Sequence, residues 1–225
     1  MSLRLAVRDM PFSLQFNGTS TRIQIPYSAS LDQTQAFTWS FYALTQYPAV
    51  NGRLIRHNIN GWNIYNSDTN SYGLTWNFPP SGFHYMYPLR VQPQWSMVTV
   101  TYDRNAPDNN LRFYRNGVLI GSVTNTTTNL TSSGAAVIRI GSEDAFNYYK
   151  GLMTHIRNWN RALTAQEVDD LYRDNAVPSN GLCLEYLFQN GTGSTAIDTS
   201  GNGNNGTITG GAYVTDTPFK SRTAI

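Results

Sequence analysis

Residues 95–123 read WSMVTVTYDRNAPDNNLRFYRNGVLIGSV, and this stretch decides the fold. Larger apolar side chains alternate with small or polar ones over residues 97–102, and a second alternation follows over residues 111–114. Asn116–Gly117 supplies the two positive-φ positions of a type I′ turn, after which the chain returns through residues 118–123. The stretch predicts an antiparallel β-meander, which must belong to a larger sheet because a hairpin alone is marginally stable in water.

The composition of the chain indicates one all-β domain. Of its 225 residues, 40% are hydrophobic and 13% aromatic, which is enough apolar material for a sizeable core. Its 18 glycines and 10 prolines are spread between short predicted strands, as in turn-dense sandwiches. The length allows one large sandwich or two small domains, and we favour a single domain over residues 1–225.

Charge and hydropathy exclude several classes of function. Only 13% of the residues are charged and the formal net charge is +2, so no nucleic-acid partner is expected. No apolar segment approaches the roughly 20 residues that cross a bilayer, so we expect no membrane insertion. The single Cys183 excludes an intrachain disulfide framework. Residues 1–16 show no secretory signal, so we expect a protein that is cytoplasmic before assembly or release and then lies on a virion or extracellular surface.

Further strands are predicted on both sides of the meander. Residues 12–16 and 21–25 flank an Asn-Gly pair and predict a second hairpin, and residues 61–65 and 72–78 predict a third. Residues 81–90 are expected to be irregular. The other predicted strands are residues 37–44, 54–59, 136–140, 152–159 and 182–188.

A short helix is predicted at residues 164–173. Thr164 as N-cap and Glu167 three residues later form a capping box. The inward-facing residues are expected to be Val168, Leu171 and Tyr172.

In their order, these motifs resemble the laminin G-like branch of the concanavalin A-like lectin/glucanase jelly rolls. SLQFNG with RIQIP, over residues 13–26, resembles the opening of that family, and the meander resembles its centre. IRIGS followed by GLMTHIRNWNRALTAQEVDDLY, over residues 138–172, resembles its closing strand and helix. The resemblance implies an all-β, two-sheet antiparallel jelly-roll sandwich with one short helix near residues 165–173.

The segment 182–211 resembles the strand and loop that usually precede the opening strand of the family, yet here it comes last. Two alternatives follow for residues 181–225. The domain is circularly permuted, with this strand beside residues 12–16 of its own subunit, or the strand is exchanged with a neighbouring copy.

The resemblance also makes structural Ca²⁺ a candidate cofactor, because some relatives bind it through acidic and carbonyl oxygens. The candidate metal ligands are Asp198, Asn202 and Asn204 in the Gly/Asn-rich loop. The alternative is an Asx-turn at Asp198 with no metal. Thr154 and His155 stand where the closing strand of the family usually carries an acidic pair.

We expect no enzymatic activity and no catalytic residues. The glucanase relatives need two close carboxylates on one strand, and no strand here has that pattern. Glu143 and Asp144 fall in a predicted loop, and Glu185 is alone on its strand. No HExxH, GxSxG or phosphate-binding glycine motif is present.

Two aromatic loops are candidate carbohydrate-binding sites, because sugars stack on aromatic rings and hydrogen-bond to neighbouring polar groups. The candidate residues are Phe83, His84, Tyr85 and Tyr87 in one loop and Phe146, Tyr148 and Tyr149 in the other. The alternative is that these rings close the ends of the sandwich or pack against another subunit.

The sequence therefore predicts a non-catalytic, lectin-like recognition module that binds surface carbohydrate. The alternative is a structural virion component, such as a decoration, fibre or tail protein, or a cell-surface adhesin without a small ligand. The expected partners are glycans, other subunits of a virion or surface assembly, or further copies of the chain.

Overall fold

The structure is a computed structural model. It describes residues 12–46, 52–57, 62–65, 94–124, 130, 134, 137–174 and 176–219, and the backbone of four short strands between residues 71 and 90.

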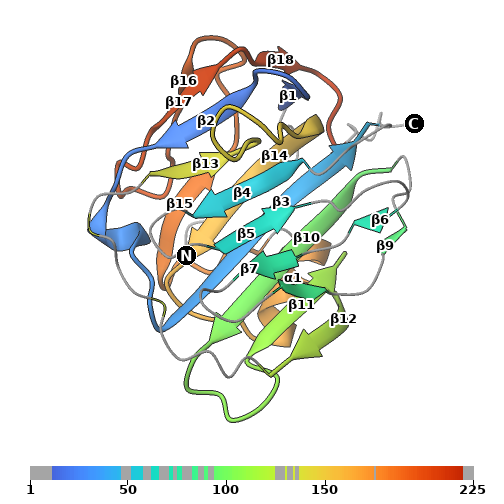
Figure 1. The fold of residues 1–225 in the computed structure, drawn as a ribbon, viewed down its shortest axis with the longest axis vertical. Coiled ribbons are helices and arrows are strands. Elements are labelled where there is room, and N and C mark those ends of the chain that lie inside the picture. Colours follow the sequence, from blue (N-terminus) through green and yellow to red (C-terminus); the bar gives the residue numbers. More distant parts are fainter. Residues whose placement is uncertain are drawn as a thin grey trace, which may run out of the picture.

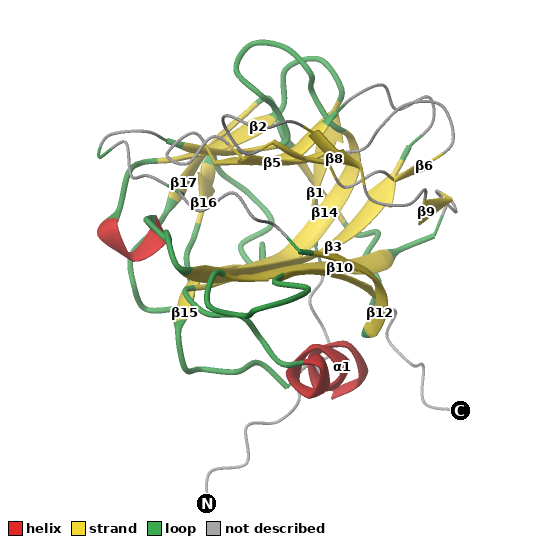
Figure 2. Ribbon diagram, turned by 60° about the horizontal axis from the view of Figure 1, so that its bottom comes forward, coloured by secondary structure: helices red, strands yellow, loops and turns green. Residues whose placement is uncertain are grey.

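Two antiparallel sheets face each other as a sandwich (Figures 1 and 2). The strands of the larger sheet are β1 (Ser13–Asn17), β3 (Ala36–Thr45), β10 (Ser96–Asp103), β11 (Leu111–Arg115), β12 (Val118–Val123), β14 (Lys150–Trp159), β15 (Leu182–Tyr186) and β18 (Ala212–Val214). Their order is β12-β11-β10-β3-β14-β1-β18, and β15 also pairs with β14. This arrangement confirms the predicted all-β sandwich.

The smaller sheet has six strands. They are β2 (Arg22–Ile25), β4 (Arg53–His57), β5 (Trp62–Tyr65), β13 (Ile138–Ile140), β16 (Thr195–Ala196) and β17 (Gly206–Thr209). Their order is β16-β17-β2-β13-β4-β5. A short 3₁₀ helix spans Ala29–Leu31.

The central meander forms as predicted. Asn116 and Gly117 have φ values of 50° and 81°, as a type I′ turn requires. Val100 lies opposite Phe113, and both side chains are buried between the sheets. The meander is therefore a scaffold whose chemistry is packing.

The helix α1 (Ala165–Asp174) covers the outer face of the larger sheet, on the side away from the smaller sheet (Figure 2). The capping box is confirmed, since the Glu167 amide donates to Thr164 Oγ1 at 3.2 Å and the Thr164 amide donates to Glu167 Oε2 at 2.8 Å. The side chains buried beneath the helix are Tyr42, Met97, Tyr114, Trp159, Leu163, Val168 and Leu171. The inward orientation predicted for Tyr172 is wrong, because this ring is 38% exposed.

The hairpin predicted for residues 12–25 is wrong. β1 belongs to the larger sheet and β2 to the smaller one. The turn between them is closed by Asn17, whose Oδ1 accepts hydrogen bonds from the amides of Thr19, Ser20 and Thr21 at 2.9, 2.9 and 3.1 Å. This turn carries the chain from one sheet to the other, so the two strands do not pair.

The hairpin predicted for residues 61–65 and 72–78 stays a prediction: β5 lies close to β7 (Thr75–Asn77), but residues 66–70 lie outside the described residues. β7 pairs with β8 (Phe83–Tyr85), and β6 (Ser71–Tyr72) pairs with β9 (Leu89–Arg90). The expectation that residues 81–90 are irregular is wrong, because they contain the short strands β8 and β9.

The C-terminal segment adds strands to both sheets of its own chain (Figure 1). β15 pairs with β14, β17 with β2, and β18 with β1. The strand at residues 182–188 was expected beside residues 12–16, but that place belongs to β18. The ion pair between Arg157 and Glu185, which lie opposite each other at 2.8 Å, fixes β15 on β14 instead.

Candidate functional site

The loop that connects β13 to β14, residues 141–149, is held at both its base and its tip. The Tyr149 amide donates to the Gly141 carbonyl at 2.8 Å, and the Arg53 amide on β4 donates to the Asn147 carbonyl at 2.9 Å. Gly141 has φ 87°, and a Cβ there would lie 2.2 Å from the Phe16 ring. The loop is therefore anchored on the smaller sheet and the core.

Glu143 is the centre of a charged network in this loop. Its carboxylate accepts a hydrogen bond from Asn147 Nδ2 at 2.8 Å. It also forms ion pairs with Arg53 Nη2, at 3.0 Å, and with Arg56 Nη1. The Arg53 guanidinium lies 4.5 Å from the centre of the Tyr65 ring, as in a cation–π contact. Glu143 and Arg53 are about 15% exposed at their side chains, so solvent screens this network less than a surface pair.

A row of polar side chains crosses the outer face of the smaller sheet beside the loop. Neighbouring strands place these residues in register, about 4.8 Å apart from strand to strand. In order across the sheet they are Thr207, Gln24, Arg139, Arg56 and Asn63. The residues that alternate with them, Ile23, Ile25, Ile55, Ile138 and Ile140, are buried in the core, so the row lies on the opposite face of the sheet. Asn63 at the end of the row is itself buried, at 3% exposure.

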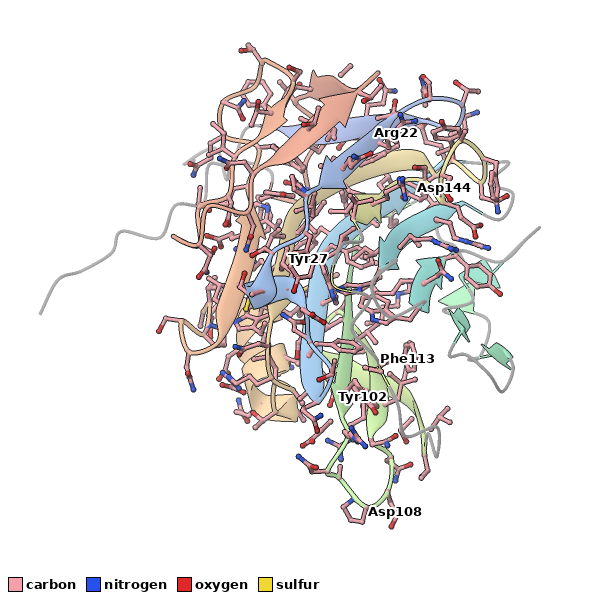
Figure 3. The ribbon with its side chains drawn as sticks, turned by 60° about the vertical axis from the view of Figure 1, so that its left-hand side comes forward. Arg22, Tyr27, Tyr102, Asp108, Phe113 and Asp144 are labelled. Carbon is pink, nitrogen blue, oxygen red and sulfur yellow. The ribbon has the colours of Figure 1, made fainter. Side chains whose placement is uncertain are left out.

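Two further contacts join β13 and β2 to the loop. Arg139 Nη1 lies 2.7 Å from Asp144 Oδ1, and Arg22 Nη1 donates to the Tyr148 hydroxyl at 3.1 Å. Figure 3 shows Arg22 and Asp144 at the same end of the molecule. The Phe146 ring at the tip of the loop is 54% exposed. We call this surface the arginine face. It consists of Arg22, Gln24, Arg53, Arg56 and Arg139 on the strands and Glu143, Asp144, Phe146 and Tyr148 on the loop.

Residues 17–169 match the laminin G-type family model described as the concanavalin A-like lectin/glucanases superfamily. The chain belongs to this superfamily. The match covers more than half of the chain and includes the meander, the loop at residues 141–149 and the start of α1. No curated protein matches the chain.

Several solved structures share the fold of the chain at low identity. A candidate carbohydrate-binding protein from Bacteroides ovatus has a TM-score of 0.66 at 16% identity and covers 91% of the chain, which spans 60% of that protein's length. The heptameric SAP-like pentraxin from Limulus polyphemus has a TM-score of 0.63 at 15% identity, with 94% of this chain and 99% of the pentraxin covered. Domain 4 of the extracellular GH43 arabinanase AbnA from Geobacillus stearothermophilus, in complex with arabinotriose, has a TM-score of 0.56 at 18% identity, with 72% and 76% covered.

Within this superfamily member, the aromatic residues predicted as binding residues fall in different places. Phe146 and Tyr148 lie on the arginine face. Tyr149 lies in the core, where it is completely buried against Phe16 and shares a 2.9 Å hydrogen bond with Thr45. The backbones of Phe83, His84 and Tyr85 form β8, and Tyr87 lies outside the described residues.

Arg22 and Arg139 were not predicted as binding residues from the sequence, although their sequence pattern indicates that they face outward. Arg22 and Gln24 alternate with Ile23 and Ile25, and Arg139 stands between two isoleucines. Such alternation places the polar residues on the outside of a sheet, but only the register shows that they adjoin.

The predicted metal ligands make a hydrogen-bonded turn. Asp198 Oδ1 accepts from the amides of Glu185 and Ser200 at 2.9 and 3.0 Å. Its Oδ2 accepts from Ser200 Oγ and from the Asn204 amide, both at 2.9 Å. Asn202 and Asn204 point N–H donors at the Leu182 and Cys183 carbonyls. The Asp198 oxygens accept hydrogen bonds from N–H and O–H donors, as in an Asx-turn. A Ca²⁺ ion needs oxygen ligands and not N–H donors, so this arrangement does not fit it. The calcium site stays a prediction.

The titratable groups singled out by sequence are engaged in structural contacts. Glu185 holds Arg157 with Oε1 and accepts from Thr199 Oγ1 with Oε2 at 2.8 Å. Cys183 is buried, and burial raises the pKa of its thiol.

Among the described residues, no group of three or more His, Cys, Asp and Glu side chains could hold a metal ion. No helix in the described part of the chain is long and apolar enough to span a membrane.

Proposed function

We propose that the protein is a non-catalytic carbohydrate-binding module and that the arginine face is its binding surface. The observation that carries this proposal is the Phe146 ring, which is 54% exposed on a loop that hydrogen bonds and ion pairs hold in place. A sugar presents a CH face that packs on such a ring and hydroxyls that hydrogen-bond to guanidinium and amide groups. Phe146 belongs to the same loop as Glu143, Asp144 and Tyr148, which contact the guanidinium groups.

The comparisons support the proposal. A candidate carbohydrate-binding protein and an arabinanase domain solved with arabinotriose have the same fold as this chain. Their low identity makes this support a matter of fold, and the residues of the arginine face supply the local argument.

Glu143 argues for binding over hydrolysis. A glycosidase needs one carboxylic acid that can give up its proton beside a second carboxylate. Glu143 is tied to two guanidinium groups and an amide, so its carboxylate has a positioning role. We therefore expect bound oligosaccharides to be recovered uncleaved after prolonged incubation, as measured by the release of reducing ends.

The test of the proposal is a glycan array followed by titration calorimetry on the glycans that bind. Phe146→Ala is expected to weaken binding by about tenfold, because it removes one aromatic stacking contact of about 1.4 kcal/mol. Tyr27→Ala is the matched control, since that ring is 39% exposed but lies elsewhere on the surface. Glycan binding that is equal in both variants and the parent, or no glycan binding at all, contradicts the proposal.

The alternative function is that of a subunit of a virion or surface assembly, and one observation favours it. β12 ends the larger sheet, and its residues Val118, Leu119 and Ile120 are 60, 49 and 37% exposed. The strand carries no charge and no proline, the two features that most often protect an edge from pairing. In this alternative, β12 of a second copy pairs with it in antiparallel fashion.

Native mass spectrometry separates the two functions. The alternative predicts a dimer or larger assembly that Leu119→Lys converts to monomers. Ile197→Lys is the control, because Ile197 is equally exposed, at 49%, in the C-terminal region. A monomeric parent protein would remove the alternative. Under either function, we propose that the protein acts on a virion or extracellular surface.

A further inference from the structure

The charges of the arginine face do not balance. It contains four guanidinium groups, from Arg22, Arg53, Arg56 and Arg139, and two carboxylates, from Glu143 and Asp144. Four positive charges against two negative ones leave an excess of two positive charges. The whole chain has a formal net charge of only +2, so the excess is concentrated in one place.

Two of these arginines lie directly side by side. Arg56 on β4 is opposite Arg139 on β13, and like charges in directly opposed positions destabilise a sheet. The carboxylates of Glu143 and Asp144 offset part of this repulsion, and they leave a net positive charge at the face. The pair therefore points to a ligand of opposite charge.

The four arginines have two different roles. Arg53 and Arg56 are held by Glu143, which fixes their position. Arg22 donates to the neutral hydroxyl of Tyr148, so this contact leaves its positive charge uncompensated.

Arg139 is held more weakly than the pair on Glu143. Its Nη1 is 2.7 Å from Asp144 Oδ1 but makes no well-directed hydrogen bond. The Arg139 side chain is 17% exposed and its Nη1 is buried, whereas the Asp144 side chain is 51% exposed, so water competes for the carboxylate of this pair. Arg22 thus has a charge that Tyr148 does not balance, and Arg139 has a donor without a well-directed acceptor, so these two groups are the ones expected to meet an anion.

We propose that the ligand is an acidic saccharide whose carboxylate or sulfate group is bound by Arg22 and Arg139 while a sugar face packs on Phe146. This inference rests on the proposed function and names the class of its ligand. A guanidinium presents paired N–H donors that match the oxygens of a carboxylate or sulfate group. Gln24 lies directly opposite Arg139 and two residues from Arg22 on β2, and it adds an amide for neighbouring hydroxyls.

The decisive test changes the ligand and leaves the protein intact. Oligogalacturonate and its methyl ester share one backbone and differ in charge, and a sulfated galactan and its desulfated form provide the same comparison for sulfate. We expect at least one charged form to bind about tenfold more tightly than its neutral counterpart at low salt, and the ratio to shrink as the Debye length falls from about 30 Å at 0.01 M to about 8 Å at 0.15 M salt.

Substitutions test whether the preference for the charged saccharide comes from the arginine face. Arg22→Gln and Arg139→Gln are expected to remove most of the preference for the charged form and to retain binding of the neutral form. Arg104→Gln is the matched control, because Arg104 lies in the turn that carries Asp108, at the opposite end of the molecule (Figure 3).

Three results would overturn the inference, and they are distinguishable. Equal binding of charged and neutral forms refutes the acidic ligand but leaves the proposed carbohydrate function standing. Absence of binding to every saccharide refutes both. A charge preference that Arg104→Gln removes and Arg22→Gln leaves intact would also place the site elsewhere and overturn the inference.

Discussion

His57 and His155 are buried without charge, and this makes the stability of the protein depend on pH. His57 stacks on Trp62 with ring centres 4.8 Å apart and contacts the Leu31 carbonyl at 2.9 Å, and burial lowers its pKa to about 4. His155 lies against Phe219 at 4.4 Å, and burial together with the nearby Arg157 lowers its pKa well below 6.5. The unfolded chain therefore binds more protons than the folded protein below about pH 6.5.

We predict that the free energy of unfolding is highest above about pH 6.5 and falls on acidification, by up to about 1.4 kcal/mol per pH unit for each histidine. His155→Asn and His57→Gln should each remove about half of this slope between about pH 6 and pH 5. Asn is chosen at position 155 because His155 has φ 49°, a region that Asn tolerates. Urea unfolding at several pH values measures the slopes, and an unchanged slope in both variants contradicts the prediction.

Asp198 is the second residue whose role can be tested alone. Because its carboxylate accepts four hydrogen bonds, Asp198→Ala should lower the free energy of unfolding by about 2–4 kcal/mol. Asp108→Ala, at an exposed turn, should change it by less than about 0.5 kcal/mol. The melting temperature of the parent protein is expected to be the same with excess Ca²⁺ and with EDTA, and a rise with Ca²⁺ would instead support the predicted metal site.

At the scale of elements, two neighbouring residues of α1 differ in burial and therefore in their expected contribution to stability. Leu171 is completely buried under the helix, whereas the adjacent Tyr172 is 38% exposed next to the turn at Gly117. Leu171→Ala should cost about 2–5 kcal/mol through the cavity it leaves. Tyr172→Ala should cost about 1 kcal/mol or less. Guanidinium unfolding of the two variants gives the comparison, and equal losses would contradict the described orientation.

The sequence predicted which segments are strands better than it predicted their partners. The alternation around Val100 and Phe113 gave both the strands and their turn, because the type I′ turn at Asn116–Gly117 is a local signal. Asn17–Gly18 carries the same residue types but turns the chain into the other sheet, since the Asn17 side chain binds three amides in place of the partner strand. Strand pairing depends on contacts beyond the turn, which a local pattern does not contain.

The candidate site was predictable only in part, for a related reason. Phe146 and Tyr148 stood out as aromatic residues in a polar loop. Arg22 and Arg139 are 117 positions apart in the sequence and come together through the register of β2 and β13. Tyr149 was misplaced because a ring beside two loop aromatics can equally point into the core, which it does against Phe16.

For the whole molecule, the C-terminal segment decides whether the sandwich closes. Deletion of residues 181–225 removes β15, β16, β17 and β18, and with them partners of β1, β2 and β14. We predict that this truncated chain is unfolded, as measured by near-UV circular dichroism and thermal melting. Deletion from Ala212 removes only β18 among the named strands and should leave a cooperative but less stable protein. A chain ending at Asn180 that melts like the parent would contradict this view.

The pairing of β1 with β18 can form only late in translation, because the two strands lie at opposite ends of the chain. Ser13 Oγ donates to the Asp216 carbonyl across a separation of 203 residues. At about 5–20 residues per second, a ribosome needs on the order of 10–40 s to supply that partner after Ser13 has been made. Until then one side of β1 and the outer side of β2 stay unpaired in the nascent chain, and unpaired strand edges aggregate readily. Yield of soluble protein should therefore depend on translation speed and on chaperones more than the final stability would suggest.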